Sequence, residues 1–212
     1  MKKALIFDMD GTLWDTTPLL HEVWNRVMQK YDETRGRYLS LEEIRGLMGK
    51  TMYEIGQATM PGVPVERQEE IFNGCIDAED EELLKKGGKL YPGLVDTLKK
   101  LKEKYHLYIV SNGQEKYAAN FISFYGFEDI FEDEETFGRT LLSKGENIKL
   151  LIERNGIDRA VYIGDTLQDE SSAAYAGVPF IYASYGFGKA EKPAETIDSI
   201  SGLPEALGRM RF

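Results

Sequence analysis

The chain has 212 residues, enough for one or two domains with a sizeable core. Its 26 basic and 36 acidic residues give a net charge of −10, which argues against a nucleic acid or an anionic membrane as a partner because both attract clustered Lys and Arg. The single cysteine, Cys75, excludes an intramolecular disulfide.

The chain opens with a short apolar run, Ala4–Phe7, which we predict to be a buried strand. Asp8 ends this run, which is too short for a signal peptide or a membrane span. We therefore expect a cytoplasmic protein. The sequence does not fix the oligomeric state, for which a monomer or a weak homodimer is the expectation.

Helix signals recur from Leu13 to Leu90, with no convincing strand among them. These signals are Pro18 as a helix start, a capping box of Ser40 and Glu43, Gly49 as a helix stop, and Pro64 before a long polar helix that ends near Gly87. We therefore predict an inserted helical-bundle cap domain at residues 16–90. Residues 1–15 and 91–212 would form the remaining domain.

Strand-like and helix-like stretches alternate through the rest of the chain. The predicted strands are Leu107–Val110, Val161–Ile163 and Phe180–Ala183, and the predicted helices are Val95–Lys104, Tyr117–Phe124, Ile148–Arg154 and Glu170–Ala176. This alternation predicts an α/β core with a Rossmann-like, doubly wound parallel sheet. The acidic runs Asp77–Glu82 and Glu132–Glu135 are expected to be solvated surface.

Two carboxylates follow the first predicted strand, in the segment Asp8-Met9-Asp10-Gly11-Thr12. Ligands of open α/β sheets bind beyond the carboxyl ends of the strands, so Asp8 and Asp10 lie where chemistry is expected. Gly11 permits a sharp turn directly after the second carboxylate. A turn rich in Asp and Gly without a function is the alternative for this segment alone.

A second pair of carboxylates, Asp165 and Asp169, follows the predicted strand Val161–Ile163. Asp169 could serve only as a helix cap. If the two strands are neighbours, Asp8 and Asp165 converge, and two charges about 4 Å apart repel by about 4 kcal/mol at an effective dielectric near 20. A cation would relieve this repulsion, and oxygen-only ligands suit Mg²⁺.

Two further segments fit the same site. Ser111-Asn112-Gly113 follows a predicted strand and offers a hydroxyl and an amide to phosphate oxygens, although Ser-Asn-Gly is also a common turn. Lys144 lies at the first turn of a predicted helix, where a cation opposes the helix dipole. A bound anion beside this lysine would explain its position. A plain surface lysine is the alternative, and Lys149 is a weaker candidate for the same role.

Together these segments resemble the motifs of the haloacid-dehalogenase-like hydrolase superfamily. The sequence carries all four motifs in the family's order: Asp8-Met9-Asp10-Gly11-Thr12, Ser111-Asn112, Lys144, and Gly164-Asp165-Thr166 with Asp169. The helical insert resembles the helical cap of this family. With this cap, the chain resembles the branch that contains phosphoglycolate phosphatase and β-phosphoglucomutase.

The resemblance implies a role for each motif residue. Asp8 would be the nucleophile that forms an aspartyl-phosphate, and Asp10 the general acid and base. Ser111 would donate to the transferring phosphoryl group, and Lys144 would balance its charge while orienting Asp8. Mg²⁺ would be bound by the Asp8 carboxylate, the Asp10 backbone carbonyl and Asp165, with direct or water-bridged support from Asp169.

Other residues are candidate contacts with the substrate, a small phosphorylated metabolite. Asn112, Gly113, Thr12 and Lys50 are candidates for binding the phosphate or the substrate, and Arg45 and Trp14 for contacting its leaving group. Surface charge and packing are the alternatives for Arg45, Lys50 and Trp14. Gly145 replaces a proline that many relatives carry after the motif lysine, and the role of Tyr185–Gly188 stays open.

The resulting hypothesis is a Mg²⁺-dependent phosphatase for small phosphate monoesters. Asp10 argues against a dehalogenase, because a halide leaving group needs no proton. A phosphomutase acting on a sugar phosphate is the first alternative. A non-catalytic protein that binds a phosphorylated metabolite is the second, although a pure binder has no use for a nucleophile and an acid together.

Overall fold

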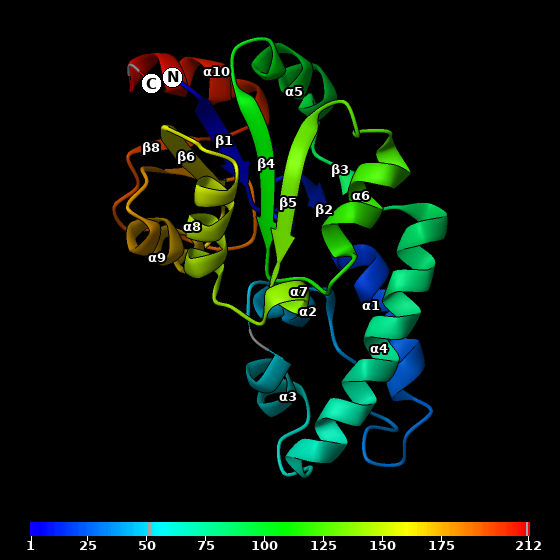
Figure 1. Cartoon of the computed structure of the whole chain (residues 1–212). Helices are drawn as coiled ribbons and strands as arrows, with labels where there is room; N and C mark the ends of the chain where they lie inside the picture. Colours follow the sequence, from blue (N-terminus) through cyan, green and yellow to red (C-terminus); the bar gives the residue numbers. More distant parts are fainter. Residues whose placement is uncertain (51, 211) are drawn as a thin grey trace. The chain divides into compact units, whose positions relative to one another are not determined.

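The computed structural model describes residues 1–50, 52–210 and 212. They form two compact units (Figure 1). The core unit contains Met1–Asp15 and Leu90–Phe212, and the helical unit contains Thr16–Lys89. The helical unit is therefore an insertion that follows the first strand of the core unit.

The core unit is built on a six-stranded parallel sheet with the strand order β5-β4-β1-β6-β7-β8. The strands are β1 (Lys3–Phe7), β4 (His106–Ser111), β5 (Phe131–Thr136), β6 (Arg159–Gly164), β7 (Phe180–Ala183) and β8 (Glu195–Ile197). This is the strand order of a doubly wound sheet, so the predicted fold class is confirmed. The order reverses between β1 and β6, which is the topological switch point.

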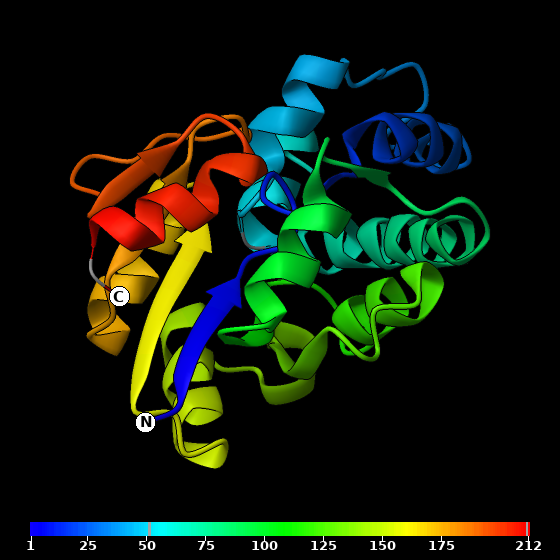
Figure 2. The same ribbon diagram turned by 90° about the horizontal axis from the view of Figure 1, so that it is seen from above.

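Helices cover the sheet of the core unit on both faces (Figures 1 and 2). They are α5 (Leu94–Lys102), α6 (Tyr117–Tyr125), α7 (Phe137–Thr140), α8 (Lys144–Arg154), α9 (Leu167–Ala176) and α10 (Leu203–Arg209), with a 3₁₀ turn at Ile200–Gly202. Ile6 packs with Ile148 of α8 and Ala173 of α9 in one apolar cluster. Phe7, its neighbour in the strand, packs against Phe131 on the other face, because side chains alternate along a strand.

The helical unit consists of α1 (Thr17–Met28), α2 (Leu41–Leu47), α3 (Met52–Thr59) and α4 (Val65–Lys86). Pro18 lies at the start of α1, and the predicted capping box of Ser40 and Glu43 opens α2. The four helices have a shared apolar core that includes Trp24 and Phe72. None of the helices in the described ranges combines the length and the hydropathy that a membrane span requires.

The expectation of two solvated acidic runs is wrong at particular residues. Glu132–Glu135 belongs to β5, and Glu135 is only 1% exposed. Glu79, in the other run, is buried and accepts a hydrogen bond of 2.9 Å from the Trp24 indole. The expectation of no strand between Leu13 and Leu90 is also wrong. This interval contains two strands of two residues each, β2 (Trp14–Asp15) and β3 (Lys89–Leu90), which form a separate small sheet.

Arginines explain how an acidic segment forms the edge strand β5. Arg154 Nη1 donates to Glu135 Oε2 over 2.7 Å, and its Nε donates to Asp133 Oδ2 over 2.9 Å. Arg139 binds Glu134 and lies 3.4 Å from Glu135. Charged residues on an edge strand also discourage pairing with another chain.

Replacing Arg154 with alanine is expected to lower the free energy of unfolding by about 1–3 kcal/mol, because it leaves the buried Glu135 carboxylate with fewer donors. Urea unfolding followed by circular dichroism measures the change. Arg209→Ala is the matched control, since Arg209 also binds two carboxylates, Glu195 and Glu205, neither of them buried. A loss in the control as large as in Arg154→Ala would contradict the argument from burial.

Candidate active site

The carboxyl ends of β1 and β6 lie side by side at the topological switch point. Phe7 pairs with Ile163, and the Asp8 N–H donates to the Ile163 carbonyl over 2.8 Å. Asp8 and Asp165, which follow these two strands, are therefore neighbours. This is the position where open α/β sheets bind their ligands.

Three carboxylates and one lysine form a buried cluster at this position. Asp8, Asp165 and Asp169 each offer an oxygen, and the three oxygens lie within 4.8 Å of one another. Lys144 Nζ donates to Asp8 Oδ1 over 2.8 Å and to Asp169 Oδ1 over 2.7 Å. Asp8 is 6% exposed and Lys144 is 5% exposed, so these charges are shielded from bulk water.

Lys144 extends into this cluster from the first turn of α8. A capping box of Ser143 and Glu146 opens the helix. A Cβ atom at Gly145 would lie 2.7 Å from the Tyr175 ring of α9. Glycine therefore lets α8 and α9 approach each other closely, which accounts for the missing proline after the lysine.

Both carboxylate oxygens of Asp169 have partners within the protein. Oδ2 accepts from the Thr166 N–H over 3.0 Å and from the Thr166 hydroxyl over 2.6 Å, and it also accepts from the Asp165 N–H. Oδ1 accepts from Lys144 and from the Tyr162 hydroxyl. Asp169 thus completes the capping box that Thr166 opens at the start of α9, and its other oxygen binds Lys144.

Asp165 retains an oxygen that could bind a cation. Its Oδ2 accepts from the Phe187 N–H over 2.7 Å, whereas Oδ1 is buried and has no hydrogen-bond partner among the described residues. A Cβ atom at Gly11 would lie 2.1 Å from Asp165 Oδ2, so only glycine permits this close approach. A buried carboxylate oxygen without a partner, beside the Asp8 carboxylate, fits the oxygen ligands that hard divalent cations prefer.

The pKa shifts indicate that the cluster holds too little positive charge for its three carboxylates. Burial raises the pKa of Asp8 to about 7 from 3.8, and Asp169 adds to this rise while Lys144 opposes it. Burial, Asp169 and Asp8 raise the pKa of Asp165 well above its ordinary value. Burial disfavours the charge of Lys144, but Asp169 and Asp8 outweigh it and raise the pKa of the lysine. One lysine therefore does not neutralise three carboxylates.

The segment Ser111–Gly113 begins with the last residue of β4, which lies on the other side of β1 from β6. Ser111 is buried, and its Oγ accepts from the Gly113 N–H over 3.1 Å. The Gly113 carbonyl accepts from the Gly138 N–H over 3.0 Å. Because β4 pairs with β1 in parallel, this loop and Asp8 lie at the same edge of the sheet.

The second carboxylate of the first motif, Asp10, lies in the turn after β1. Asp10 is partly buried, and its Oδ1 accepts a hydrogen bond of 3.0 Å from the Tyr117 hydroxyl. Sequence patterns do not select Tyr117, because a tyrosine at the start of a helix carries no signal for a partner so far away in the chain.

The loop Tyr185–Gly188, whose role the sequence left open, contacts two motif residues. The Tyr185 hydroxyl donates to the Thr12 carbonyl over 2.8 Å, and the Phe187 N–H donates to Asp165. The Thr12 hydroxyl is buried and has no hydrogen-bond partner in the part of the chain that the structure describes. This loop therefore supports the turn after β1 and the end of β6.

Three further residues were candidates for contact with the substrate. Trp14 is 2% exposed and packs edge-on against Tyr117 and Phe121, so it has a packing role. Arg45 and Lys50 are exposed residues of the helical unit. Their contacts with a substrate stay predictions.

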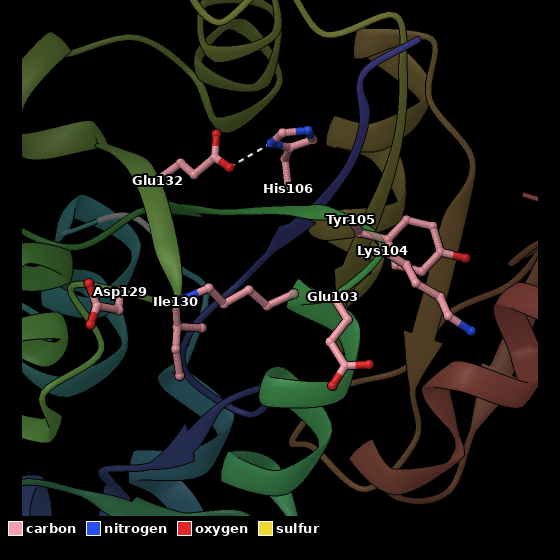
Figure 3. A pocket seen from close by; sticks show the side chains of 8 residues that line it. Glu103, Lys104, Tyr105, His106, Asp129, Ile130 and Glu132 are labelled. Atoms are coloured by element: carbon pink, nitrogen blue, oxygen red, sulfur yellow. Dashed lines mark hydrogen bonds and ion pairs between the residues drawn. The ribbon is translucent and has the colours of Figure 1, made fainter.

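A pocket of about 310 Å³ lies at the amino ends of β4 and β5 (Figure 3). Its lining includes Tyr105 and His106, and His106 Nδ1 lies 2.5 Å from Glu132 Oε1. The strands are parallel, so this rim is opposite the edge that carries Asp8. We therefore assign this pocket no part in the candidate active site.

Comparisons with known proteins agree with the motifs. Residues 5–183 match the family model of haloacid dehalogenase-like hydrolases. A phosphoglycolate phosphatase from Rhodobacter capsulatus is 30% identical over 196 residues, which cover 89% of this chain and 87% of that protein. A phosphorylated carbohydrates phosphatase from Thermotoga maritima is 27% identical over 186 residues, covering 85% and 84%.

A solved structure has the same fold. The haloacid dehalogenase-like hydrolase from Streptococcus pneumoniae superposes with a TM-score of 0.82 at 20% identity, covering 99% of this chain and 98% of that one. The family model spans most of the sequence, from the first strand to the end of β7. The chain therefore belongs to the haloacid dehalogenase-like hydrolase family.

Proposed function

We propose that this chain is a Mg²⁺-dependent phosphatase that hydrolyses small phosphate monoesters through an aspartyl-phosphate on Asp8. The observation that carries this proposal is the meeting of Asp8, Asp165 and Lys144 at the switch point of the sheet. The class of enzyme, a hydrolase of phosphoric monoester bonds, agrees with the family and with the named relatives.

Asp8 acts as the nucleophile. A carboxylate oxygen of Asp8 attacks the phosphorus, the bond from phosphorus to the leaving oxygen breaks, and an aspartyl-phosphate forms. Lys144, 2.8 Å from Asp8 Oδ1, favours the ionised carboxylate and fixes its orientation. Asp169 binds Lys144 from the other side and keeps the ammonium group directed at Asp8.

Asp10 transfers the protons in both half-reactions. It donates a proton to the departing alkoxide, which leaves as the alcohol, and its carboxylate then accepts a proton from the attacking water. The water attacks the phosphorus, the bond to Asp8 breaks, and inorganic phosphate leaves with Asp8 and Asp10 restored.

Groups at the same edge of the sheet bind the phosphate. Ser111 and the Asn112–Gly113 segment supply hydroxyl, amide and backbone donors for its oxygens. The Thr12 hydroxyl, which is buried without a partner among the described residues, is a further candidate donor. We place these contacts on the loop after β4 and on the turn after β1.

The metal site consists of the Asp8 and Asp165 carboxylates with the Asp10 backbone carbonyl. Mg²⁺ at this site would supply positive charge to the carboxylates and to the phosphoryl oxygens. We place Asp169 in a supporting role, because both of its oxygens already accept hydrogen bonds within the protein. Asp165 Oδ1, which has no hydrogen-bond partner among the described residues, is the oxygen best suited to the cation.

The expected substrate is a small aliphatic phosphate monoester, such as phosphoglycolate or a sugar phosphate, in line with the names of the relatives. We propose that the helical unit acts as a cap that excludes bulk water during the reaction. Lys50 is our candidate cap residue for contact with the substrate.

A screen of phosphorylated metabolites tests the proposal. It includes phosphoglycolate, hexose phosphates, nucleoside monophosphates and pyrophosphate, each assayed for phosphate release with Mg²⁺ and with a chelator. We expect release from at least one aliphatic monoester, and a loss of about 100-fold or more without metal, since a metal supplies several kcal/mol of charge stabilisation in the transition state.

Product analysis distinguishes the alternatives. A hexose phosphate that is isomerised without release of phosphate would identify a phosphomutase. Absence of turnover across the whole panel with Mg²⁺ present would instead favour a non-catalytic binding protein.

A further inference from the structure

Tyr117 is a buried tyrosine whose hydroxyl contacts the proposed general acid. It is 6% exposed, lies at the start of α6, and donates to Asp10 Oδ1 over 3.0 Å. The contact lies entirely within the core unit. The Asp10 side chain therefore has a fixed donor on one of its two oxygens.

Packing on two sides holds the Tyr117 ring in this position. Trp14 contacts the ring edge-on, with centroids 5.6 Å apart. A Cβ atom at Gly113 would lie 2.5 Å from the ring, so the ring packs directly on the backbone of the proposed phosphate-binding loop. A side chain confined in this way can direct its hydroxyl at one atom without losing further rotamer freedom.

We propose that Tyr117 is a positioning residue that orients Asp10 for proton transfer to the leaving group. Tyr117 occupies Oδ1 as a donor, so the proton that Asp10 transfers resides on Oδ2. The carboxyl group cannot rotate to exchange its two oxygens without breaking this hydrogen bond. This inference rests on the proposed function, because it assigns Asp10 the role of the acid.

The role has a kinetic signature that depends on the leaving group. Breaking an alkyl phosphate releases a strongly basic alkoxide, which needs a proton during departure. p-Nitrophenyl phosphate releases a stable phenolate that departs without one. An enzyme with a misplaced acid should therefore lose activity on the alkyl ester and keep most of it on the aryl ester.

Tyr117→Phe tests this signature, because it removes the hydroxyl and keeps the ring packing. We expect kcat/KM for the best alkyl phosphate to fall about 10- to 100-fold, which is part of the contribution of general acid catalysis. For p-nitrophenyl phosphate the change should stay within about 3-fold, since the departing phenolate draws little on that catalysis. The parameter kcat/KM covers the steps up to departure of the leaving group and excludes the later attack by water.

Two further measurements separate positioning from a structural effect. Tyr105→Phe, at the opposite rim of the sheet, is the matched control. It should leave kcat/KM unchanged for both the alkyl ester and p-nitrophenyl phosphate. In an Asp10→Asn background, Tyr117→Phe should cause little additional loss with the alkyl ester, because the two residues act as one unit.

Equal losses on both esters in Tyr117→Phe, no loss on either, or full additivity with Asp10→Asn would overturn the assignment. A wild-type enzyme that hydrolyses neither ester would instead refute the proposed phosphatase function, and the two failures are thereby distinguished. Thermal unfolding of Tyr117→Phe confirms that the variant is folded before its kinetics are compared.

Discussion

Asp8→Asn is expected to reduce turnover of any phosphate monoester by a factor on the order of 10⁴ or more, because the amide cannot form the aspartyl-phosphate. The variant should still fold. In the metal-free protein, burial and Asp169 raise the pKa of Asp8 to about 7, so the site tolerates a neutral side chain of the same shape at little cost. The activity loss therefore reports chemistry and not unfolding.

Two assays check this prediction. Phosphate release is measured with wild type, Asp8→Asn and Asp198→Asn, the last being the same change at an exposed aspartate of the core unit. Acid quenching with a radiolabelled substrate should trap protein-bound phosphate in the wild type and none in Asp8→Asn. Turnover in Asp8→Asn comparable to that of Asp198→Asn would refute the nucleophile assignment.

The sheet and its functional edge could be predicted because both depend on local sequence. Runs such as Phe180–Ala183 are apolar on both faces, which only a covered parallel strand requires. Asp8 and Asp165 follow such runs directly, so the fold class alone places both at the carboxyl edge. The sequence left open whether their two strands are neighbours, and the observed strand order shows that β1 and β6 are.

Elements stabilised by distant partners could not be predicted. β5 consists mostly of acidic residues, and its buried Glu135 is satisfied by Arg154, nineteen positions later in the sequence. The Tyr117 contact with Asp10 joins residues 107 positions apart. The Lys50 prediction lies in the helical unit, where a contact with a substrate depends on three-dimensional relations that no local pattern encodes.

Asp169 shows how a local helix pattern and a distant contact combine in one residue. Asp169 could be read as a helix cap or as a site residue, and its two oxygens have different partners: Oδ2 belongs to the capping box with Thr166, and Oδ1 binds Lys144. The cap fixes one oxygen on Thr166, which leaves the other directed at Lys144. Local helix chemistry thus orients the lysine that the proposed reaction needs.

Lys144→Met is expected to lower both the stability and the activity of the enzyme. The change keeps an unbranched side chain of similar length and removes the cation that binds Asp8 and Asp169. Removing one partner of a buried ion pair typically costs about 3–5 kcal/mol. Loss of the charge that stabilises the transferring phosphoryl group should lower kcat about 10²- to 10³-fold.

The stability loss should depend on pH. Asp8 has a pKa of about 7 in the folded protein against 3.8 ordinarily, so the folded state binds its proton more tightly than the unfolded chain does. Its contribution to stability is therefore fully present below about pH 4 and is lost as the pH rises through 7. Lys144 lowers this pKa, so its removal should destabilise the metal-free protein more at pH 8 than at pH 5.

Thermal and urea unfolding at the two pH values, with Mg²⁺ and with a chelator, measure these effects. Mg²⁺ should restore part of the stability of Lys144→Met at pH 8 and less at pH 5, because a cation has more charge to neutralise when the carboxyl groups are ionised.

Lys149→Met is the matched control: Lys149 lies on the same helix, is exposed, and contacts the Tyr175 ring. Its loss should stay below about 0.5 kcal/mol at both pH values. Equal losses of unfolding free energy in Lys144→Met and Lys149→Met would contradict this argument. Removing a charge at an exposed position would then cost as much as removing it within the buried cluster.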